Sequence, residues 1–219
     1  MKTFKLEGTP RVALGKKASK ELRKKSLIPA ILYGREPVEL PYKGTLNPGE
    51  KVVETGDGKG IVVTDFTVST DGVRKLIYSP DIYLVEIEIK GNRTVKAILK
   101  DSQYHPVSDN ILHIDFLEVF DDKPIVMEVP VFLTGHAEGV KAGGKLNQSM
   151  RKLKVKGLAV NIPEKLDISI DSLELGKAIK VGELKFENIE IISPKNAVVC
   201  IVKMTRASQS AAAAAATGK

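Results

Sequence analysis

The sequence predicts a mainly β protein, with an N-terminal β-barrel, one or two short helices and a second, mostly β C-terminal domain. Short runs in which apolar and polar residues alternate recur along the chain, a period typical of strands that bury one face. Glycine and proline separate these runs, which favours barrels or sandwiches. A chain of 219 residues has the length of one or two domains.

The clearest predicted element is a β-hairpin. Within Ile82–Ile89, apolar residues alternate with Glu86 and Glu88, as in a half-buried strand. The segment Lys90–Arg93 contains a Gly-Asn pair typical of tight turns, and Thr94–Lys100 has the pattern of a return strand. The same reasoning predicts further strands at residues 38–42, 60–68, 111–119, 125–133, 152–160, 166–170 and 197–203.

Helices are expected to be few: residues 18–25, residues 71–78 and a turn at 172–176. The polar segment Asp121–Pro124 lies between two strand-like runs and is the best linker. It suggests a barrel domain over residues 1–121 and a C-terminal β domain over residues 122–206. The remaining residues, 207–219, contain six consecutive alanines and are expected to be disordered or a frayed helix.

Positive charge is concentrated at the start of the chain. Residues 1–43 hold eleven Lys/Arg and four Asp/Glu, a net charge of +7. Residues 44–121 hold eight and thirteen (−5), and residues 122–219 hold fifteen and ten (+5). A strongly basic block followed by an acidic stretch creates a local field, which favours a polyanionic partner.

The segment Arg11–Lys25 contains seven basic residues and one acidic residue, Glu21. In a helix over residues 18–25, the spacing of Lys20, Arg23 and Lys24 puts these cations on one face. Leu22 would lie on the opposite side, where it could anchor the helix to a sheet. Lys16 and Lys17 would precede the helix, whose N-terminus favours phosphate.

A buried strand is predicted to follow, over Leu27–Gly34, with Tyr33 beside Arg35 at its end. A solvated helix face explains an isolated run of charges equally well. Here, however, acidic partners are nearly absent, and the strand adds an aromatic ring and a guanidinium group. Nucleic-acid sites often combine these groups, so we favour a nucleic-acid-binding surface.

Two ordered sequence blocks resemble the signatures of the bacterial large-subunit ribosomal protein L-twenty-five family. One is GKKASKELR at residues 15–23, continued by IPAILYG at 28–34; the other is LKDSQYHP at 99–106, leading to HIDF at 113–116. Residues 124–206 resemble the extra domain of longer members, of the Ctc or general stress protein type. The residues that carry this second resemblance are VPV at 129–131, Gly135, GVKAGGKL at 139–146, IP at 162–163, DSL at 171–173 and LG at 175–176.

The resemblance implies a β-barrel that binds 5S ribosomal RNA, largely through the minor groove of an irregular internal-loop helix. In the family, the basic helix binds phosphates and a His-x-Asp pair helps to read the groove. Glu21 departs from a position that is often basic, and residues 36–68 are longer than the usual connection. The matching positions are Lys16, Lys20, Arg23, Tyr33, Lys100, His113 and Asp115, to which we add Arg11 and Lys24 as expected contacts.

A carboxylate repels phosphate, so Asp115 suits an RNA site only as an acceptor for a 2′-hydroxyl or a base amino group. A metal site or hydrolase built on His113 and Asp115 is the main chemical alternative. It would need His105 or Asp101 as a third ligand, and no cysteine cluster or HExxH motif supports it.

Three other motifs have simpler structural explanations. Gly139–Lys145 fits GxxxxGK, but Leu146 replaces the Ser/Thr of a phosphate loop, which favours a glycine-rich turn. Cys200 lies in an apolar run and is expected to be inert core. Residues 152–156 alternate with lysine, which favours a solvated strand face over a secondary RNA or protein contact.

We therefore expect a ribosomal protein that is not an enzyme and requires no cofactor, metal, membrane or small-molecule substrate. The expected partners are 5S ribosomal RNA, the large ribosomal subunit and neighbouring ribosomal proteins contacted by the C-terminal domain. A single cysteine and a charged N-terminus without an apolar signal indicate the cytoplasm. The alternative is a stress-related interaction module only loosely associated with the ribosome.

Overall fold

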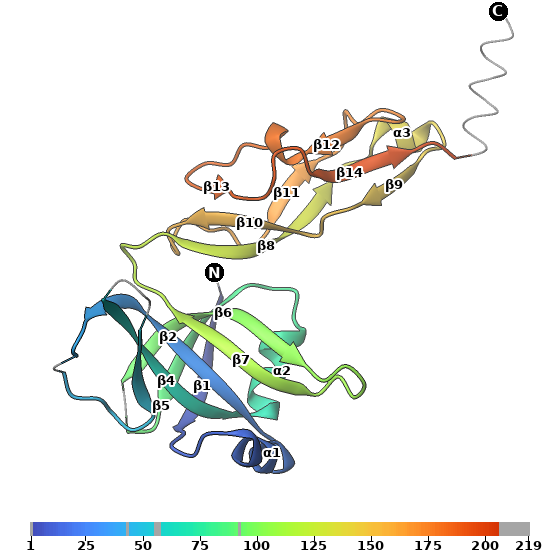
Figure 1. The fold of residues 1–219 in the computed structure, drawn as a ribbon. Coiled ribbons are helices and arrows are strands. Elements are labelled where there is room, and N and C mark those ends of the chain that lie inside the picture. Colours follow the sequence, from blue (N-terminus) through green and yellow to red (C-terminus); the bar gives the residue numbers. More distant parts are fainter. Residues whose placement is uncertain (1, 43, 55–57, 92, 206–219) are drawn as a thin grey trace, which may run out of the picture. The chain divides into compact units, whose positions relative to one another are not determined.

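The computed structural model describes residues 2–42, 44–54, 58–91 and 93–205, without the side chains of residues 35 and 36. Its residues form two compact units, with the boundary between Lys123 and Pro124 (Figure 1). The predicted fold class, mainly β with few short helices, is confirmed. Among the described residues, no helix is long and apolar enough to cross a membrane. The expected disorder of residues 207–219 concerns a segment outside the described part.

Six strands of the first unit close into a barrel. The strand order is β1-β5-β6-β7-β2-β4, and the pairing of Thr9 in β1 with Thr67 in β4 completes the ring. The remaining strand, β3, pairs with the first half of β4, on the edge that β1 occupies further along. The strands are β1 (Lys2–Pro10), β2 (Leu27–Glu39), β3 (Glu50–Glu54), β4 (Lys59–Ser69), β5 (Tyr83–Ile89), β6 (Thr94–Tyr104) and β7 (Ile111–Glu118).

The predicted hairpin is confirmed as β5 and β6, which pair antiparallel. The predictions for β4 and β7 are also confirmed to within a residue or two. The separate strand predicted at residues 38–42 is wrong, because β2 continues from Leu27 to Glu39. Beyond a bulge, Pro37 and Val38 pair with β4, so the second half of β2 extends the same ladder.

Two helices accompany the barrel. α1 (Lys16–Lys24) begins two residues earlier than predicted, so Lys16 and Lys17 are its first residues and do not precede it. It follows Gly15, whose φ of 103° is accessible to glycine at little cost. Ser69 caps the N-terminus of α2 (Thr70–Tyr78), because its hydroxyl accepts a hydrogen bond from the Gly72 N–H.

The alternation of β7 places the candidate site. Ile114 and Phe116 are fully buried in the barrel core, where the Phe116 ring lies 5.9 Å from that of Phe66. Successive side chains of a strand point to opposite faces, so His113 and Asp115 lie on the outer face. Both are half-buried there. The apolar residues that fold the barrel thus fix where its polar pair is displayed.

The second unit contains two small sheets, with strand orders β11-β8-β10-β13 and β12-β14-β9. A helical turn α3 (Glu138–Lys141) and a 3-10 turn η1 (Val181–Glu183) complete it. The fully buried Cys200 lies in the second sheet, and burial raises the pKa of its thiol, as expected for inert core. The strands are β8 (Ile125–Thr134), β9 (Lys145–Gln148), β10 (Lys152–Gly157), β11 (Leu166–Ser169), β12 (Ala178–Lys180), β13 (Glu190–Ile191) and β14 (Val198–Lys203).

Several motif residues of the second unit meet at one point. The Asp171 carboxylate accepts hydrogen bonds from the His136 N–H (2.8 Å) and the Ser169 hydroxyl (3.0 Å). Gly135 has a φ of 90°, and a Cβ at this position would collide with the same carboxylate. The glycine-rich segment predicted as a turn contains most of α3, and β9 begins at its last residue, Lys145.

Candidate nucleic-acid interface

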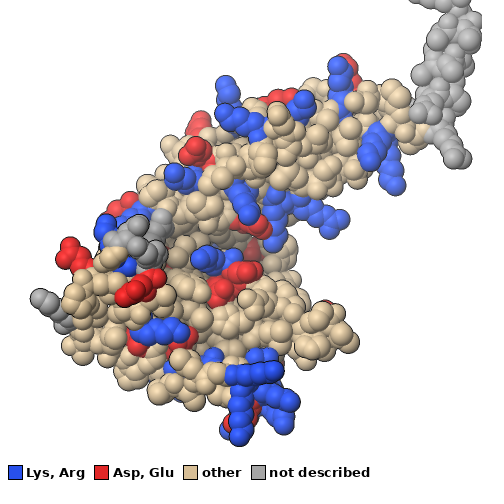
Figure 2. Space-filling model, viewed as in Figure 1, with Lys and Arg blue, Asp and Glu red and all other residues tan. Residues whose placement is uncertain are grey.

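Four of the predicted phosphate-binding residues lie on α1 and are exposed: Lys16, Lys20, Arg23 and Lys24. Basic side chains gather at the bottom of the view in Figure 2, where Figure 1 places α1. No ion pair among the described residues involves any of the four. Their charge is therefore not neutralised by ion pairs within the described part of the chain, and we call these four residues the cationic helix face.

The N-terminus of α1 is also open. Gly15 provides no side chain to cap it, and its first turn contains no acidic residue. Helix N-termini carry N–H groups without intrahelical partners and the positive end of the helix dipole. A phosphate at this end would therefore meet both the dipole and Lys16.

The other predicted contacts come from three strands. Tyr33 lies on β2, Lys100 on β6, and His113 and Asp115 on β7. Parallel pairing sets Tyr33 beside Leu117, so the Tyr33 side chain shares the outer face of β7 with the His-x-Asp pair. The Lys100 Nζ lies 4.8 Å from the centre of the Tyr33 ring, a cation–π contact. The structure thus brings these four residues together, and we call them the outer-face cluster.

Asp115 carries an acceptor that the described part of the chain does not satisfy. Its Oδ1 atom is buried and has no hydrogen-bond donor among the described residues. The His113 Nδ1 lies 3.0 Å away, close enough for electrostatic attraction, but the two do not form a hydrogen bond. A buried acceptor without a donor costs free energy, so Oδ1 favours any donor that can reach it. The side chain as a whole is 18% exposed, so the accessible part of the carboxylate is the part other than Oδ1.

The Tyr33 hydroxyl is held in its neutral form. Burial raises its pKa above the usual value, and the negative charges of Asp115 and Asp65 raise it further. A neutral phenol donates a hydrogen bond, so Tyr33 can bind a phosphate or base acceptor.

Sequence reasoning did not identify Asp65, whose buried carboxylate pairs with Lys51 at 2.6 Å. A lone Asp in the apolar run from Val62 to Val68 was the available signal.

Arg11 occupies a different position from the other predicted contacts. It follows the last residue of β1, and its Nη2 donates to the Ser19 hydroxyl of α1 at 2.8 Å. Its Nε donates to the Ala13 carbonyl oxygen, also at 2.8 Å. Part of this guanidinium is therefore engaged within the chain. Ser19 is a functional candidate that the sequence patterns did not reveal.

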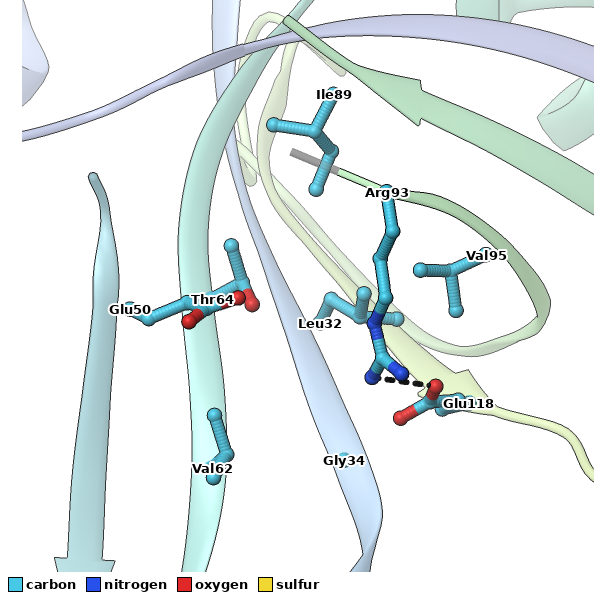
Figure 3. A pocket seen from close by; sticks show the side chains of 9 residues that line it. All are labelled: Leu32, Gly34, Glu50, Val62, Thr64, Ile89, Arg93, Val95 and Glu118. Atoms are coloured by element: carbon cyan, nitrogen blue, oxygen red, sulfur yellow. Dashed lines mark hydrogen bonds and ion pairs between the residues drawn. The ribbon is translucent and has the colours of Figure 1, made fainter. Parts of the chain in front are cut away.

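A cavity in the first unit is lined by none of the predicted contact residues, although Leu32 and Gly34, which flank Tyr33, border it (Figure 3). Its volume is about 20 Å³, which is room for roughly one water molecule. Across it, the Arg93 guanidinium reaches Glu118 at 2.7 Å (Figure 3). The cavity is far smaller than a pocket for a metabolite.

The metal-site alternative finds little support in the geometry. The described residues contain no group of three or more His, Cys, Asp or Glu side chains placed to hold a metal ion. His105, a possible third ligand, lies in the loop between β6 and β7. There its Nδ1 accepts the N–H groups of Val107 and Ser108, which gives it a structural role in the loop.

These features define a class of protein: a basic, mainly β protein with an exposed cationic helix face. Comparison with known families is more specific. Residues 6–47 and 52–116 match the model of the ribosomal L25p family. Residues 124–206 match the model described as ribosomal protein TL5, C-terminal domain.

The chain is similar over almost its whole length to proteins named large ribosomal subunit protein bL25. It is 57% identical to that of Porphyromonas gingivalis, with 97% of this chain and 98% of the relative covered. It is 52% identical to that of Parabacteroides distasonis (97% and 99% covered) and 50% identical to that of Bacteroides thetaiotaomicron (98% and 99%).

The chain therefore belongs to the ribosomal L25p family, in a form with a TL5-type C-terminal domain. This confirms the resemblance seen in the sequence. The family consists of structural proteins of the ribosome, so the prediction that the chain is not an enzyme is also confirmed.

Proposed function

We propose that this protein is a structural component of the large ribosomal subunit that binds 5S ribosomal RNA through its N-terminal barrel. Family membership supports the ribosomal role and, with it, action on the cytoplasmic ribosome. The observation that carries the RNA contact is the cationic helix face, which is exposed and free of ion pairs among the described residues. Nothing in the proposal requires catalysis or a cofactor.

The cationic helix face supplies the affinity. Lys16, Lys20, Arg23 and Lys24 bind backbone phosphates and release the counterions that the RNA had held. Arg11 adds to this field. If about five phosphates are neutralised, the logarithm of the binding constant falls with that of salt at a slope of roughly −3 to −4.

The outer-face cluster supplies the preference for one RNA shape. An RNA minor groove is wide and shallow and exposes 2′-hydroxyl groups that short side chains reach. Asp115 accepts a hydrogen bond from such a hydroxyl or from a base amino group, and His113 lies beside it to orient the carboxylate. Tyr33 donates its phenolic hydrogen, while Lys100 stacks on its ring and adds positive charge near the backbone.

Both of these surfaces belong to the N-terminal domain, and we assign the C-terminal domain a separate role. Residues 1–121 form the RNA-binding barrel, and residues 122–206 form a β domain that contacts neighbouring components of the subunit. The family models support it, because the L25p match ends at residue 116 and the TL5-type match begins at residue 124.

Substitutions in the full-length chain test the proposal. We expect Arg23→Ala to weaken binding to 5S RNA and to an unrelated structured RNA alike, because phosphate contacts carry no sequence information. Asp115→Ala and His113→Ala should weaken binding to 5S RNA by about tenfold and leave the unrelated RNA unaffected, because they remove groove contacts. Filter binding over a range of salt measures both effects.

Asp167→Ala serves as a control, because it removes an exposed carboxylate from the second unit. Equal losses on both RNAs for all three variants would refute the groove-reading role of His113 and Asp115. Failure of the unaltered chain to bind 5S RNA in dilute buffer would refute the function itself.

A further inference from the structure

The cationic helix face lies on a helix that has little to hold it in place. α1 has nine residues, and none of them is buried. Helices of this length are marginal in water unless tertiary contacts stabilise them. Only Ala18, Ser19 and Leu22 are half-buried. The orientation of four cations therefore depends on a small number of contacts.

Arg11 supplies contacts on both sides of this helix. Its backbone N–H donates to the Asp65 carbonyl oxygen of β4 at 2.9 Å, which ties it to the barrel. Its side chain extends to the helix, where Nη2 donates to the Ser19 hydroxyl at 2.8 Å. The Nε bond to Ala13 holds the intervening loop in the same arrangement.

Ser19 continues the connection into the start of the helix. Its hydroxyl donates to the Gly15 carbonyl oxygen at 2.9 Å, and its N–H donates to the same oxygen at 3.0 Å. Gly15 otherwise provides no side-chain cap. The bonds among Arg11, Ser19 and Gly15 thus join the barrel wall to the first turn of α1.

We propose that Arg11 and Ser19 act together as positioning residues that fix α1 on the barrel and aim its cations at the RNA. This inference rests on the proposed function. It gives Arg11 a role that lysine cannot fill, because an ammonium group lacks the planar fork that makes two directed bonds at once. The remaining N–H groups of the guanidinium stay available for phosphate.

A simple phosphate contact by Arg11 makes a different prediction. A lysine at this position keeps the positive charge, so a contact that depends on charge alone would survive Arg11→Lys. Ser19→Ala changes no charge and raises intrinsic helix propensity, so any loss of helical order in this variant comes from the lost hydrogen bonds. The pair is therefore suited to a double-mutant cycle.

The experiment compares Arg11→Lys, Ser19→Ala and the double variant in the full chain. Millisecond hydrogen exchange in the free protein reports the order of residues 16–24, and titration with 5S RNA reports affinity and salt slope. Each single variant should exchange faster over this segment and bind about fivefold more weakly, with the slope unchanged. The double variant should be no worse than either single variant, because both remove the same connection.

Arg151→Lys and Ser149→Ala, two exposed positions of the second unit, are the matched controls and should change neither readout. Unchanged exchange in Arg11→Lys, or additive losses of affinity without faster exchange, would overturn the positioning role. Because exchange is measured without RNA, failure of this inference is distinguishable from failure of the unaltered chain to bind 5S RNA.

Discussion

Each unit of the molecule displays three cations at close spacing, but their surroundings differ. On α1, Lys20, Arg23 and Lys24 share a helix face without a described ion pair. On β10, the corresponding set is Lys152, Lys154 and Lys156. Here the Lys154 Nζ lies 3.9 Å from Glu128, and Lys156 lies opposite Glu190 in the antiparallel ladder. The number of cations is equal in the two places, while the balance of charge is not.

The fold explains one set and leaves the other unexplained. The lysines of β10 alternate with Leu153 and Val155, which are fully buried, so the strand needs polar residues on its outer face. α1 buries no residue, and a helix face of this kind has no folding requirement for positive charge. Cations that the fold does not require, and that acids do not balance, are the stronger indication of an anionic partner.

Each set of cations is expected to stand on a scaffold with its own core, and substitutions of core residues should have the largest effect. Phe116→Ala should destabilise the barrel by about 3–5 kcal/mol, because it empties the contact with Phe66. Leu153→Ala should destabilise the second unit by about 2–5 kcal/mol. Calorimetry should show each substitution lowering a different transition. A single transition that falls equally in both variants would contradict separate cores.

Each set of three cations can be replaced by alanine in one triple variant, which gives two variants that are matched in charge. Replacing Lys20, Arg23 and Lys24 should weaken binding to 5S RNA on the order of 100-fold at moderate salt and reduce the salt slope by about 2–3. Replacing Lys152, Lys154 and Lys156 should change the affinity by less than about twofold, because an exposed pair such as Lys154–Glu128 already satisfies part of that charge.

Both triple variants remove three positive charges, so net charge alone predicts equal losses. Equal losses of affinity in the two variants would therefore show that the two surfaces contribute to RNA binding only through net charge. Circular dichroism and the thermal midpoint of each variant provide the control for folding. Alanine favours helix, so the α1 variant should keep its secondary structure.

Local patterns were sufficient to predict the strands whose alternation is regular. In β5, and in β7 from Ile114 onward, apolar residues at every second position are buried, which is the pattern that the sequence displays. β1 was missed because its inner positions include Gly8, which interrupts the apolar series after Leu6. β3 was missed because its five residues are only half-buried or exposed, so they carry no strong pattern.

The candidate site divides in the same way. The spacing of Lys20, Arg23 and Lys24 predicted three of the four residues of the cationic helix face. Alternation along β7 predicted that His113 and Asp115 share a face. Both predictions depend on neighbours in sequence. The interactions of Asp65 and Ser19 depend on contacts that form only when the chain folds. The Lys51–Asp65 pair arises from the register of β3 with β4, and the Arg11–Ser19 bond from the path of a loop. Sequence patterns report periodicity and do not report such long-range contacts.

The smallest expected effect concerns Asp171, whose carboxylate accepts hydrogen bonds within the second unit. Hydrogen bonds from the His136 N–H and then from the Ser169 hydroxyl lower the pKa of its carboxyl below the usual value. A lowered pKa in the folded state means that the ionised group stabilises the fold at neutral pH. This contribution is lost as the pH falls below about 4, where the carboxyl becomes protonated in the unfolded chain and then in the folded one.

Asp171→Asn should therefore melt slightly below the unaltered chain at pH 7, and the difference should narrow as the pH falls below about 4. Only the transition of the second unit should respond, because His136, Ser169 and Gly135 all belong to it. RNA binding should not change, since the proposed interface lies on the barrel. A gap in melting temperature that does not narrow as the pH falls would show that Asp171 acts through its shape and not through its charge.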